Sequence, residues 1–471
     1  MRKAFEIGFG ASEQEVTVDS LPVQGEIPAW VRGELFRNGP GTFTVGEQKY
    51  RHWFDGLAML HKFSIKNGRV AYANKFLESK AYNEAQKNGY ITYQEFATDP
   101  CHTLFGRVKA VFQPKITDSA KVNIATIAEK YLALSETPMQ VEFDPETLKS
   151  LGVVNYDKHP RMHTTTVHPQ FDFDENQVYN LVTRFNRVSH YRFMQIDNEW
   201  NASLVAKTAV KEPAYLHSFG LSKNYIILAE FPLVVQPLAL LFQLKPFIEN
   251  YKWKPKRGTR WFIFDRKTGA LVKQATSNAF FAFHHVNAFE RGDELVVDIA
   301  TYPDNEIINS FYLKTIADEQ ATLPGGTLKR FSINLKKDDA VQEEQLSDQW
   351  IELPRFDYDR YNMSNDYRFV YASSISKKKP LSFYNQIVKM DIATGESKSW
   401  YEEHCFPGEP VFVGRPGRER EDDGIIFTVV LDEKKGNSFL LILDAASFDE
   451  MARAEIPHAV LFGYHGAFYE N

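Results

Sequence analysis

The sequence predicts an all-β fold, and within that class it favours a β-propeller. Short runs of β-branched and aromatic residues, which are typical of strands, recur along the 471 residues. Asp-Gly, Asn-Gly and Thr-Gly pairs separate these runs and favour hairpin turns. Many short strands in one long chain are compatible with a sandwich, a barrel or a propeller, and the propeller fits the length best. Because there is no clean repeat of roughly 40 to 50 residues, this choice depends on length and strand number.

The expected strands and helices follow from local residue patterns. The clearest strand patterns, in chain order, are RVAYANKF (69–76), YIILAEF (225–231), RWFIFD (260–265), ELVVDIATY (294–302) and FLLILDAA (439–446). Helical patterns are few and short, and the best two cover residues 242–253 and 447–456. No Gly-, Ser- or Pro-rich linker and no shift in composition divides the chain. We therefore expect a single domain over residues 1–471.

Charge and cysteine content exclude some classes of protein. The formal net charge is -6 and the pI is near 6.2, which gives no basic face for nucleic acid, so none is expected as a partner. The cysteines are Cys101 and Cys405, too few for a disulfide framework, and a reducing compartment is expected. The first residues, MRKAFEIGFGASEQEV, lack the apolar core of a signal peptide, so the sequence predicts a cytoplasmic protein.

Several histidines lie in apolar, strand-like surroundings. They are His168 in TTTVHPQFD, His217 in AYLHSFGLS, the pair in FAFHHVNAFE, and His465 in FGYHGAFYEN. Imidazoles that converge in an apolar interior need a reason, and a transition metal supplies one, because neutral imidazole is a good ligand for iron, copper, zinc or nickel. Their wide separation in the sequence excludes a local, finger-like site. It suits a closed β structure whose strands bring one residue each to a common axis.

The adjacent histidines at 284 and 285 cannot both point to that axis, because neighbouring side chains in a strand face opposite ways. The small residues expected on the face of His284 are Ala282, Val286 and Ala288. Phe283 is expected on the opposite face, with His285. Since small residues suit a crowded axis, the pattern favours His284 as the inward residue and His285 as a packing or hydrogen-bonded residue.

A series of short motifs runs through the chain in a fixed order. They are FRNGPGTF (36–43), HWFDGLAMLHKF (52–63), VHPQFD (167–172), LHSFGLSKNYIILAEFPL (216–233), FHHVNAFE (283–290), GEPVFV (408–413), EDDGIIFTVV (421–430) and YHGAF (464–468). This ordered set resembles the carotenoid cleavage oxygenase family, which includes carotenoid dioxygenases, stilbene-cleaving dioxygenases and the vertebrate retinoid isomerase. The resemblance implies a seven-bladed β-propeller with a cap of helices and loops over the active-site face.

The resemblance also implies a site. One ferrous iron, Fe(2+), would lie on the propeller axis, held by His168, His217, His284 and His465. Three glutamates would lie behind three of these imidazoles, namely Glu136, Glu352 and Glu409. A carboxylate that accepts the distal ring N–H fixes the tautomer and raises the basicity of the other nitrogen. Val122 falls where many carotenoid cleavers carry a threonine whose methyl group covers the iron, and we expect its methyl groups to do the same.

The reaction that the resemblance implies is cleavage of a conjugated double bond of a carotenoid or apocarotenoid by O2, giving two carbonyl products. The segment 244–269 looks more like animal-type members than plant epoxycarotenoid dioxygenases, which favours a cut at the 15,15' or 9',10' bond. A retinoid-ester isomerohydrolase that uses the same iron as a Lewis acid, and a stilbene-cleaving dioxygenase, remain alternatives. A non-catalytic propeller that serves as an interaction platform is a more remote one, since buried imidazoles would be costly without a metal.

A carotenoid dissolves in bilayers, so peripheral contact with a membrane is expected. The apolar segment 231–247 is the first candidate, with Lys245 able to reach the headgroups. Its prolines and short length exclude a spanning helix, and a buried connection between blades is the alternative. The segment 98–112 resembles a second membrane-facing part of the family. Cys101 within it could accept a lipid, although a free buried thiol is the simpler expectation.

Overall fold

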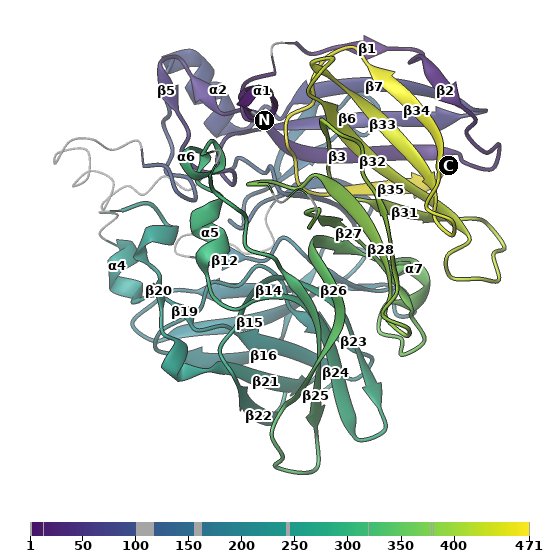
Figure 1. Cartoon of the computed structure of the whole chain (residues 1–471). Coiled ribbons are helices and arrows are strands. Elements are labelled where there is room, and N and C mark those ends of the chain that lie inside the picture. Colours follow the sequence, from purple (N-terminus) through teal and green to yellow (C-terminus); the bar gives the residue numbers. More distant parts are fainter. Residues whose placement is uncertain are drawn as a thin grey trace.

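The protein is built almost entirely of antiparallel sheets (Figure 1). The computed structural model describes residues 2–12, 14–99, 117–154, 163–241, 245–318, 320–377, 379 and 381–470. The first sheet contains β1 (Thr17–Val18), β7 (Arg69–Phe76), β6 (Leu57–Lys66), β3 (Gly33–Thr42) and β35 (Gly466–Glu470). The second contains β11 (Ser150–Val154), β10 (Gln140–Phe143), β9 (Lys130–Leu134) and β8 (Asn123–Ile127). The third contains β12 (His163–Thr165), β14 (Gln177–Arg184), β15 (Ser189–Ile196) and β16 (Ala202–Val210), with β13 (Gln170–Asp172) also paired to β14.

The remaining large sheets follow in chain order. The fourth contains β17 (Gly220–Leu221), β18 (Tyr225–Glu230), β21 (Thr259–Asp265) and β22 (Leu271–Ser277). A seven-stranded sheet contains β23 (Phe281–Arg291), β24 (Glu294–Tyr302), β25 (Thr327–Asn334), β26 (Gln342–Arg355), β27 (Phe369–Ser374), β28 (Gln386–Asp391) and β29 (Ser397–Trp400). The last contains β2 (Val23–Gly25), β34 (Glu450–Ile456), β33 (Asn437–Asp444), β32 (Gly424–Asp432) and β30 (Cys405–Pro407), with β31 (Val411–Gly414) on β32. The large sheets in the described part of the chain number six, and the long strand β26 joins the two halves of the seven-stranded one. The number of seven blades stays a prediction from the resemblance.

Short elements complete the described part of the chain. Two small hairpins pair β4 (Thr44–Val45) with β5 (Gln48–Lys49) and β19 (Leu233–Val234) with β20 (Lys252–Trp253). The helices are α1 (Arg2–Gly8), α2 (Lys80–Asn88), α4 (Pro237–Leu241), α5 (Glu306–Ser310), α6 (Leu313–Ile316) and α7 (Tyr358–Tyr361), with 3₁₀ turns at Ile248–Asn250 and Pro255–Arg257. Figure 1 shows α2, α4, α5 and α6 on one side of the sheets, where a cap was expected.

Strands from the two ends of the chain close the fold. The C-terminal β35 pairs with β3 of the first sheet, and the N-terminal β2 pairs with β34 of the last sheet. In Figure 1 the purple and yellow strands therefore lie side by side. Buried apolar residues fill the spaces between neighbouring sheets. Phe36 on β3, for example, packs its ring against Tyr131, Phe143 and Tyr469, with centroids 5.7 to 5.9 Å apart.

The strand predictions were confirmed and the helix predictions were not. RVAYANKF and ELVVDIATY are β7 and β24 with the expected bounds. The segment 447–456, expected as a helix, instead contains β34, which pairs with both β33 and β2. Its alanine, arginine and glutamate favour helix locally, but the alternating burial of Glu450–Ile456 fits a strand between two partners. In 242–253 the described part has a single 3₁₀ turn followed by β20, because Pro246 interrupts a helix there.

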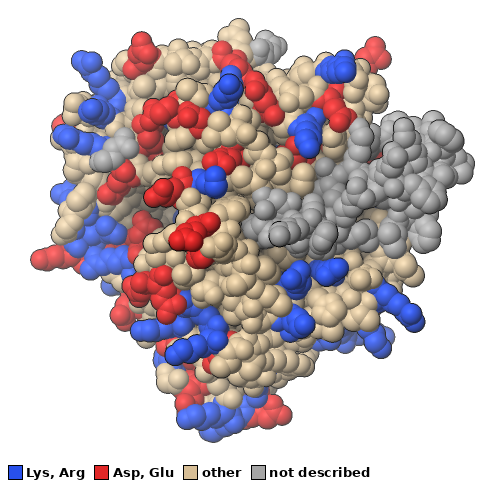
Figure 2. Space-filling view, turned by 180° about the vertical axis from the view of Figure 1, so that it is seen from behind, with Lys and Arg blue, Asp and Glu red and all other residues tan. Residues whose placement is uncertain are grey.

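Charged side chains do not gather by sign on the face shown in Figure 2. Lys and Arg side chains alternate there with Asp and Glu side chains. Exposed ion pairs are common in the described part of the chain, for example Arg51 with Glu249 and Lys379 with Glu403. Such exposed pairs contribute little to stability. The stability of the fold therefore comes chiefly from the apolar residues buried between sheets.

Replacement of Phe36 by alanine tests this packing. Phe36 is 1% exposed and lies between the first and second sheets, so Phe36→Ala is expected to lower the free energy of unfolding by about 3 to 5 kcal/mol. Tyr90→Ala, at a residue that is 50% exposed, serves as the control and should change it by less than about 0.5 kcal/mol. The urea midpoint of each variant measures the effect, and equal shifts would contradict this description of the core.

Candidate metal centre

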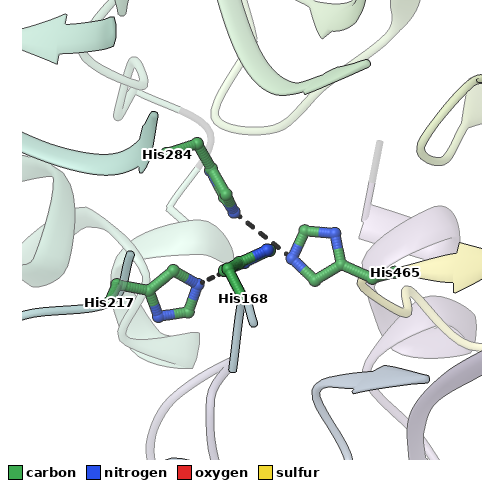
Figure 3. Close-up of side chains that lie close together, drawn as sticks. All are labelled: His168, His217, His284 and His465. Atoms are coloured by element: carbon green, nitrogen blue, oxygen red, sulfur yellow. Dashed lines mark hydrogen bonds between the residues drawn. The ribbon is translucent and has the colours of Figure 1, made fainter. Parts of the chain in front are cut away.

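Four imidazoles from distant parts of the chain meet at one point, as the motifs predicted (Figure 3). His168 lies in the loop between β12 and β13, His217 just before β17, His284 in β23 and His465 just before β35. One nitrogen from each ring lies within 4.8 Å of those of the other three. The Nε2 atoms of His168 and His217 are 3.2 Å apart, and those of His284 and His465 are 3.3 Å apart.

The other ring nitrogen of three of these histidines faces a carboxylate. His217 Nδ1 lies 2.7 Å from Glu136 Oε1, and His465 Nδ1 lies 2.7 Å from Glu409 Oε1. His284 Nδ1 makes the equivalent hydrogen bond to Glu352. In a neutral imidazole the proton then lies on Nδ1, and the Nε2 lone pair is directed at the centre of the cluster. The three glutamates that the resemblance implied thus have the expected geometry.

The three glutamates have different further partners. The Tyr215 hydroxyl donates to Glu136 at 2.6 Å, and the Tyr302 hydroxyl donates to Glu352 at 2.6 Å. Glu409 has no exposed side-chain surface and instead meets two guanidinium groups, from Arg37 at 3.3 Å and Arg355 at 3.2 Å. Burial alone would raise the pKa of Glu409, but Arg355, His465 and Arg37 together hold that pKa at about 2.

Backbone contacts set the position of His465. The N–H of Asn38 on β3 donates to the His465 carbonyl at 2.9 Å, and the His465 N–H donates to the Val122 carbonyl at 3.3 Å. The chain can approach β3 this closely because two glycines face each other. A Cβ atom on Gly39 would lie 2.5 Å from the Cα atom of Gly463. The segment that carries His465 is therefore bonded to both the first and the second sheet.

A bulge in β23 decides which of the adjacent histidines reaches the centre. Regular pairing with β24 is interrupted between Ala282 and His285 and again between His285 and Asn287. His284 points to the cluster, as expected. His285 is directed away, and its Nδ1 lies 2.8 Å from Ser218 Oγ, which also accepts the His285 backbone N–H. Burial and the nearby His284 lower the pKa of His285 to about 3, so its ring is neutral.

The alternation rule was wrong for Phe283. Strict alternation put this ring on the face opposite His284, yet both residues line the same cavity. The cause is the bulge, which inserts an unpaired stretch into the strand and turns consecutive side chains towards one side. Ser218 fixes this irregular backbone, since its hydroxyl donates to the Phe283 carbonyl at 2.6 Å. Because Ser218 directly follows His217, the same contact also holds two of the four imidazoles together.

The four imidazoles fit a first-row transition metal. Burial, followed by the neighbouring imidazoles, lowers the pKa of His168 well below its usual value, and burial lowers that of His465 to about 4, so both rings are neutral at pH 7. Nitrogen atoms that bind the same metal ion at a metal–nitrogen distance of about 2.1 Å are expected to lie about 3 Å from one another. A cation would also offset the cost of burying so many polar rings in one place. Imidazole is a good ligand for iron, although the donor set alone does not choose among first-row metals.

An apolar cavity of about 210 Å³ opens onto the imidazoles. Its aromatic and aliphatic lining consists of Trp53, Phe54, Phe96, Val122, Phe185, Leu240, Phe247, Phe283, Phe311, Leu353 and Tyr464. Trp53 and Phe54 belong to the motif HWFDGLAMLHKF, and Leu240 and Phe311 come from the side of α4 and α5. Val122 thus lies in the cavity wall and is bonded through its carbonyl to His465.

Some residues of the site were not predicted as such. Arg37 was visible only as part of the motif FRNGPGTF, and Tyr215 could have been suspected because it lies two residues before His217. Tyr302 and Arg355 carry no local signal, since they reach Glu352 and Glu409 through the fold. Cys405 is a free, buried thiol. Cys101 and most of the segment 98–112 lie outside the described residues.

Comparison with known proteins decides the family. A family model described as Retinal pigment epithelial membrane protein matches residues 9–470. The chain belongs to this carotenoid oxygenase family. Among its relatives, the Beta,beta-carotene 15,15'-dioxygenase of Gallus gallus is 34% identical over 507 residues, covering 95% of this chain and 94% of the relative. The Carotenoid isomerooxygenase of Galleria mellonella is 33% identical over 489 residues, covering 97% and 94%.

Solved structures of the carotenoid oxygenase family have the same fold. Cobalt-substituted Synechocystis ACO matches with a TM-score of 0.88 and 25% identity, covering 100% of this chain and 99% of that chain. An ACO/RPE65 chimera matches with the same TM-score and coverage. The predicted propeller fold and the expected likeness to animal-type members of the family are therefore confirmed. The metal-binding role of the four histidines stays a prediction.

Replacing the two adjacent histidines one at a time tests the metal centre. His284→Ala removes one nitrogen from the cluster and is expected to lower metal affinity by more than the roughly 10- to 100-fold typical of losing a supporting residue. His285→Ala is the matched control, because His285 is the adjacent, partly buried histidine and its ring is bonded to Ser218. Metal analysis of the purified proteins should find the metal retained in His285→Ala only. Equal metal content in both variants would contradict the assignment.

The carboxylates can be tested separately from the imidazoles. Glu352→Gln keeps an oxygen that accepts from His284 Nδ1 but removes the negative charge, so metal affinity is expected to fall by about 10- to 100-fold. Competition with a chelator measures the affinity. Glu230→Gln is the control, since Glu230 is also fully buried but is bonded to Tyr191, Arg257 and Arg260. An unchanged affinity in Glu352→Gln would show that the carboxylate only orients the ring.

Proposed function

We propose that this protein is a non-haem Fe(2+) dioxygenase that cleaves a conjugated double bond of a carotenoid or apocarotenoid. The observation that carries the proposal is that three of the four clustered imidazoles, those of His217, His284 and His465, line a mainly apolar cavity. The names of the relatives, which include carotenoid dioxygenases, point the same way. The bond expected to be cut is the 15,15' or the 9',10' bond.

The reaction needs little from the protein beyond binding and orientation. One C=C bond and one O2 give two C=O groups, so the atoms balance without a further reductant. Bound iron supplies the activation of dioxygen. His168, His217, His284 and His465 would hold the metal, while Glu136, Glu352 and Glu409 orient three of the rings through hydrogen bonds to Nδ1. Trp53, Phe54, Phe283 and Val122 exclude water and hold the polyene by apolar contact.

Membrane contact belongs to the proposal as well, in a narrower form than the sequence suggested. In the segment 231–247, residues 231–235 are buried in the core, so this half is a connection between strands. Leu238 on α4 is 63% exposed, whereas Leu240 on the same helix lines the cavity. We infer that α4 and Lys245 surround an entrance through which an apolar substrate passes from a lipid surface. No helix in the described ranges is long and apolar enough to cross a bilayer.

Two expectations stay predictions. A cytoplasmic location and a single domain over residues 1–471 are compatible with the cysteine content and with a family match that runs from residue 9 to residue 470. The retinoid-ester isomerohydrolase and the stilbene-cleaving dioxygenase differ from the proposal in ways that an assay separates. The first consumes no O2, and the second cuts a phenolic substrate in preference to a carotenoid.

Product analysis tests the proposed function. The purified, iron-assayed protein is incubated with β-carotene and with an apocarotenal in detergent, under air and under nitrogen. Carbonyl fragments are expected under air only, and ¹⁸O2 should label both products, with His284→Ala inactive and His285→Ala active. Fragment length identifies the bond. Stoichiometric iron without oxygen-dependent fragments would favour the isomerase or the stilbene enzyme, and the absence of any metal would favour the non-catalytic propeller.

A further inference from the structure

One part of the apolar cavity wall carries a buried ion pair. Lys121 Nζ lies 2.7 Å from Glu95 Oε2, and the Thr117 hydroxyl donates to the other Glu95 oxygen at 2.6 Å. All three residues line the cavity that leads to the imidazoles. The side chains of Lys121 and Glu95 are 5% and 2% exposed. The hydroxyl-bearing residues Ser135 and Thr137 continue this polar region along the same wall.

A structural role explains this pair poorly. Removing two charges from water is expensive, and replacing a buried ion pair by well-packed apolar residues is often neutral or stabilising. Burial raises the pKa of Glu95 in spite of the adjacent ammonium, which reflects that cost. The nearby carboxylate of Asp55 raises the pKa of Glu95 further, which adds to the cost of keeping Glu95 charged. Aromatic and aliphatic side chains form much of the remaining lining, together with polar ones such as Gln94 and Asn250. A buried ion pair in this wall therefore points to a ligand that has a polar atom.

We propose that Lys121, held in place by Glu95, binds the oxygen-bearing end of the substrate, a hydroxyl or carbonyl group on an otherwise apolar polyene. This inference rests on the proposed function and narrows its substrate class to oxygenated polyenes in preference to pure hydrocarbons. An ammonium group has three N–H donors, so after its bond to Glu95 it still has donors for a ligand oxygen. A hydroxyl can also donate to a carboxylate oxygen, so the pair accommodates both groups.

The backbone next to Lys121 couples this contact to the metal centre. Val122 accepts the His465 N–H through its carbonyl and lines the cavity itself. The ammonium therefore lies at a fixed place relative to the imidazoles. Anchoring the oxygenated end at Lys121 would set the register of the polyene, and hence which double bond lies beside the metal. Lys121 is then a specificity-determining residue, because it acts on the far end of the substrate and not on the reacting carbons.

The test removes both charges and compares two substrates. Lys121→Met/Glu95→Gln avoids leaving an unpaired carboxylate, and glutamine can still accept from Thr117. For wild type and variant, kcat/KM is measured with an apocarotenal and with a hydrocarbon carotenoid in the same detergent. Loss of a hydrogen bond from a charged group is expected to lower kcat/KM for the aldehyde by about 10- to 100-fold. The value for the hydrocarbon should stay within about twofold, and fragment lengths from the aldehyde should become mixed.

A matched control separates recognition from stability. Lys389 and Asp422 form another buried lysine pair at 2.7 Å, with side chains 6% and 15% exposed, and neither lines the cavity. Lys389→Met/Asp422→Asn should leave the ratio of the two kcat/KM values unchanged, even if it lowers stability. If Lys121→Met/Glu95→Gln does not fold, Lys121→Gln replaces it, because a glutamine amide can still donate to Glu95 while the ammonium is lost.

Binding measurements keep this inference separate from the proposed function. Quenching of tryptophan fluorescence reports on ligands in the cavity, because Trp53 lines it. For each protein, the Kd for the hydrocarbon is divided by the Kd for the aldehyde or the corresponding alcohol. This ratio should be at least about tenfold larger in wild type than in the variant. This ratio is informative even if neither substrate is cleaved, in which case only the proposed reaction fails. Equal losses for both ligands, or no loss for either, would overturn the role of Lys121.

Discussion

The hydrogen bond between an imidazole and a carboxylate is the interaction on which the geometry of the four-histidine cluster depends. Each such bond fixes one ring nitrogen, so that the other is directed at the remaining imidazoles, as in His217 with Glu136. The carboxylate in turn needs its own partners, which Tyr215, Tyr302, Arg37 and Arg355 provide. These partners come from several sheets, so the imidazole rings reach their final orientation only when the sheets of the propeller have packed together.

Much of this arrangement could be predicted from the sequence, and the rest was hidden for physical reasons. Strands such as ELVVDIATY carry a strong local signal, and the four histidine motifs are contiguous and easily seen. The strand at 450–456 was missed because its residues favour helix, and only pairing with distant strands decides otherwise. The bulge at His284 could not be foreseen for a similar reason. It depends on Ser218, which is distant in sequence but adjacent in space.

The cavity combines two demands that usually conflict. An apolar polyene requires aromatic walls without competing polar groups, which Trp53, Phe54 and Phe283 supply. The double bonds along a polyene are chemically alike, so contacts along its length cannot select one of them. The protein must therefore fix the position of the polyene by binding one of its ends. Aromatic walls meet the first demand, and Lys121, held by Glu95 at a fixed place relative to the imidazoles, would meet the second. The apolar walls then supply affinity and the polar group supplies register.

The closure of the propeller by β35 has a consequence for when the proposed metal site forms. A growing chain that has reached Trp400 already carries three of the four imidazoles and two of the three carboxylates. It lacks Glu409 and His465, and the strand β3, which carries Arg37, still awaits β35. The four imidazoles and three carboxylates therefore come together only when β35 has paired with β3. Closing the propeller and completing the proposed metal site are the same folding step.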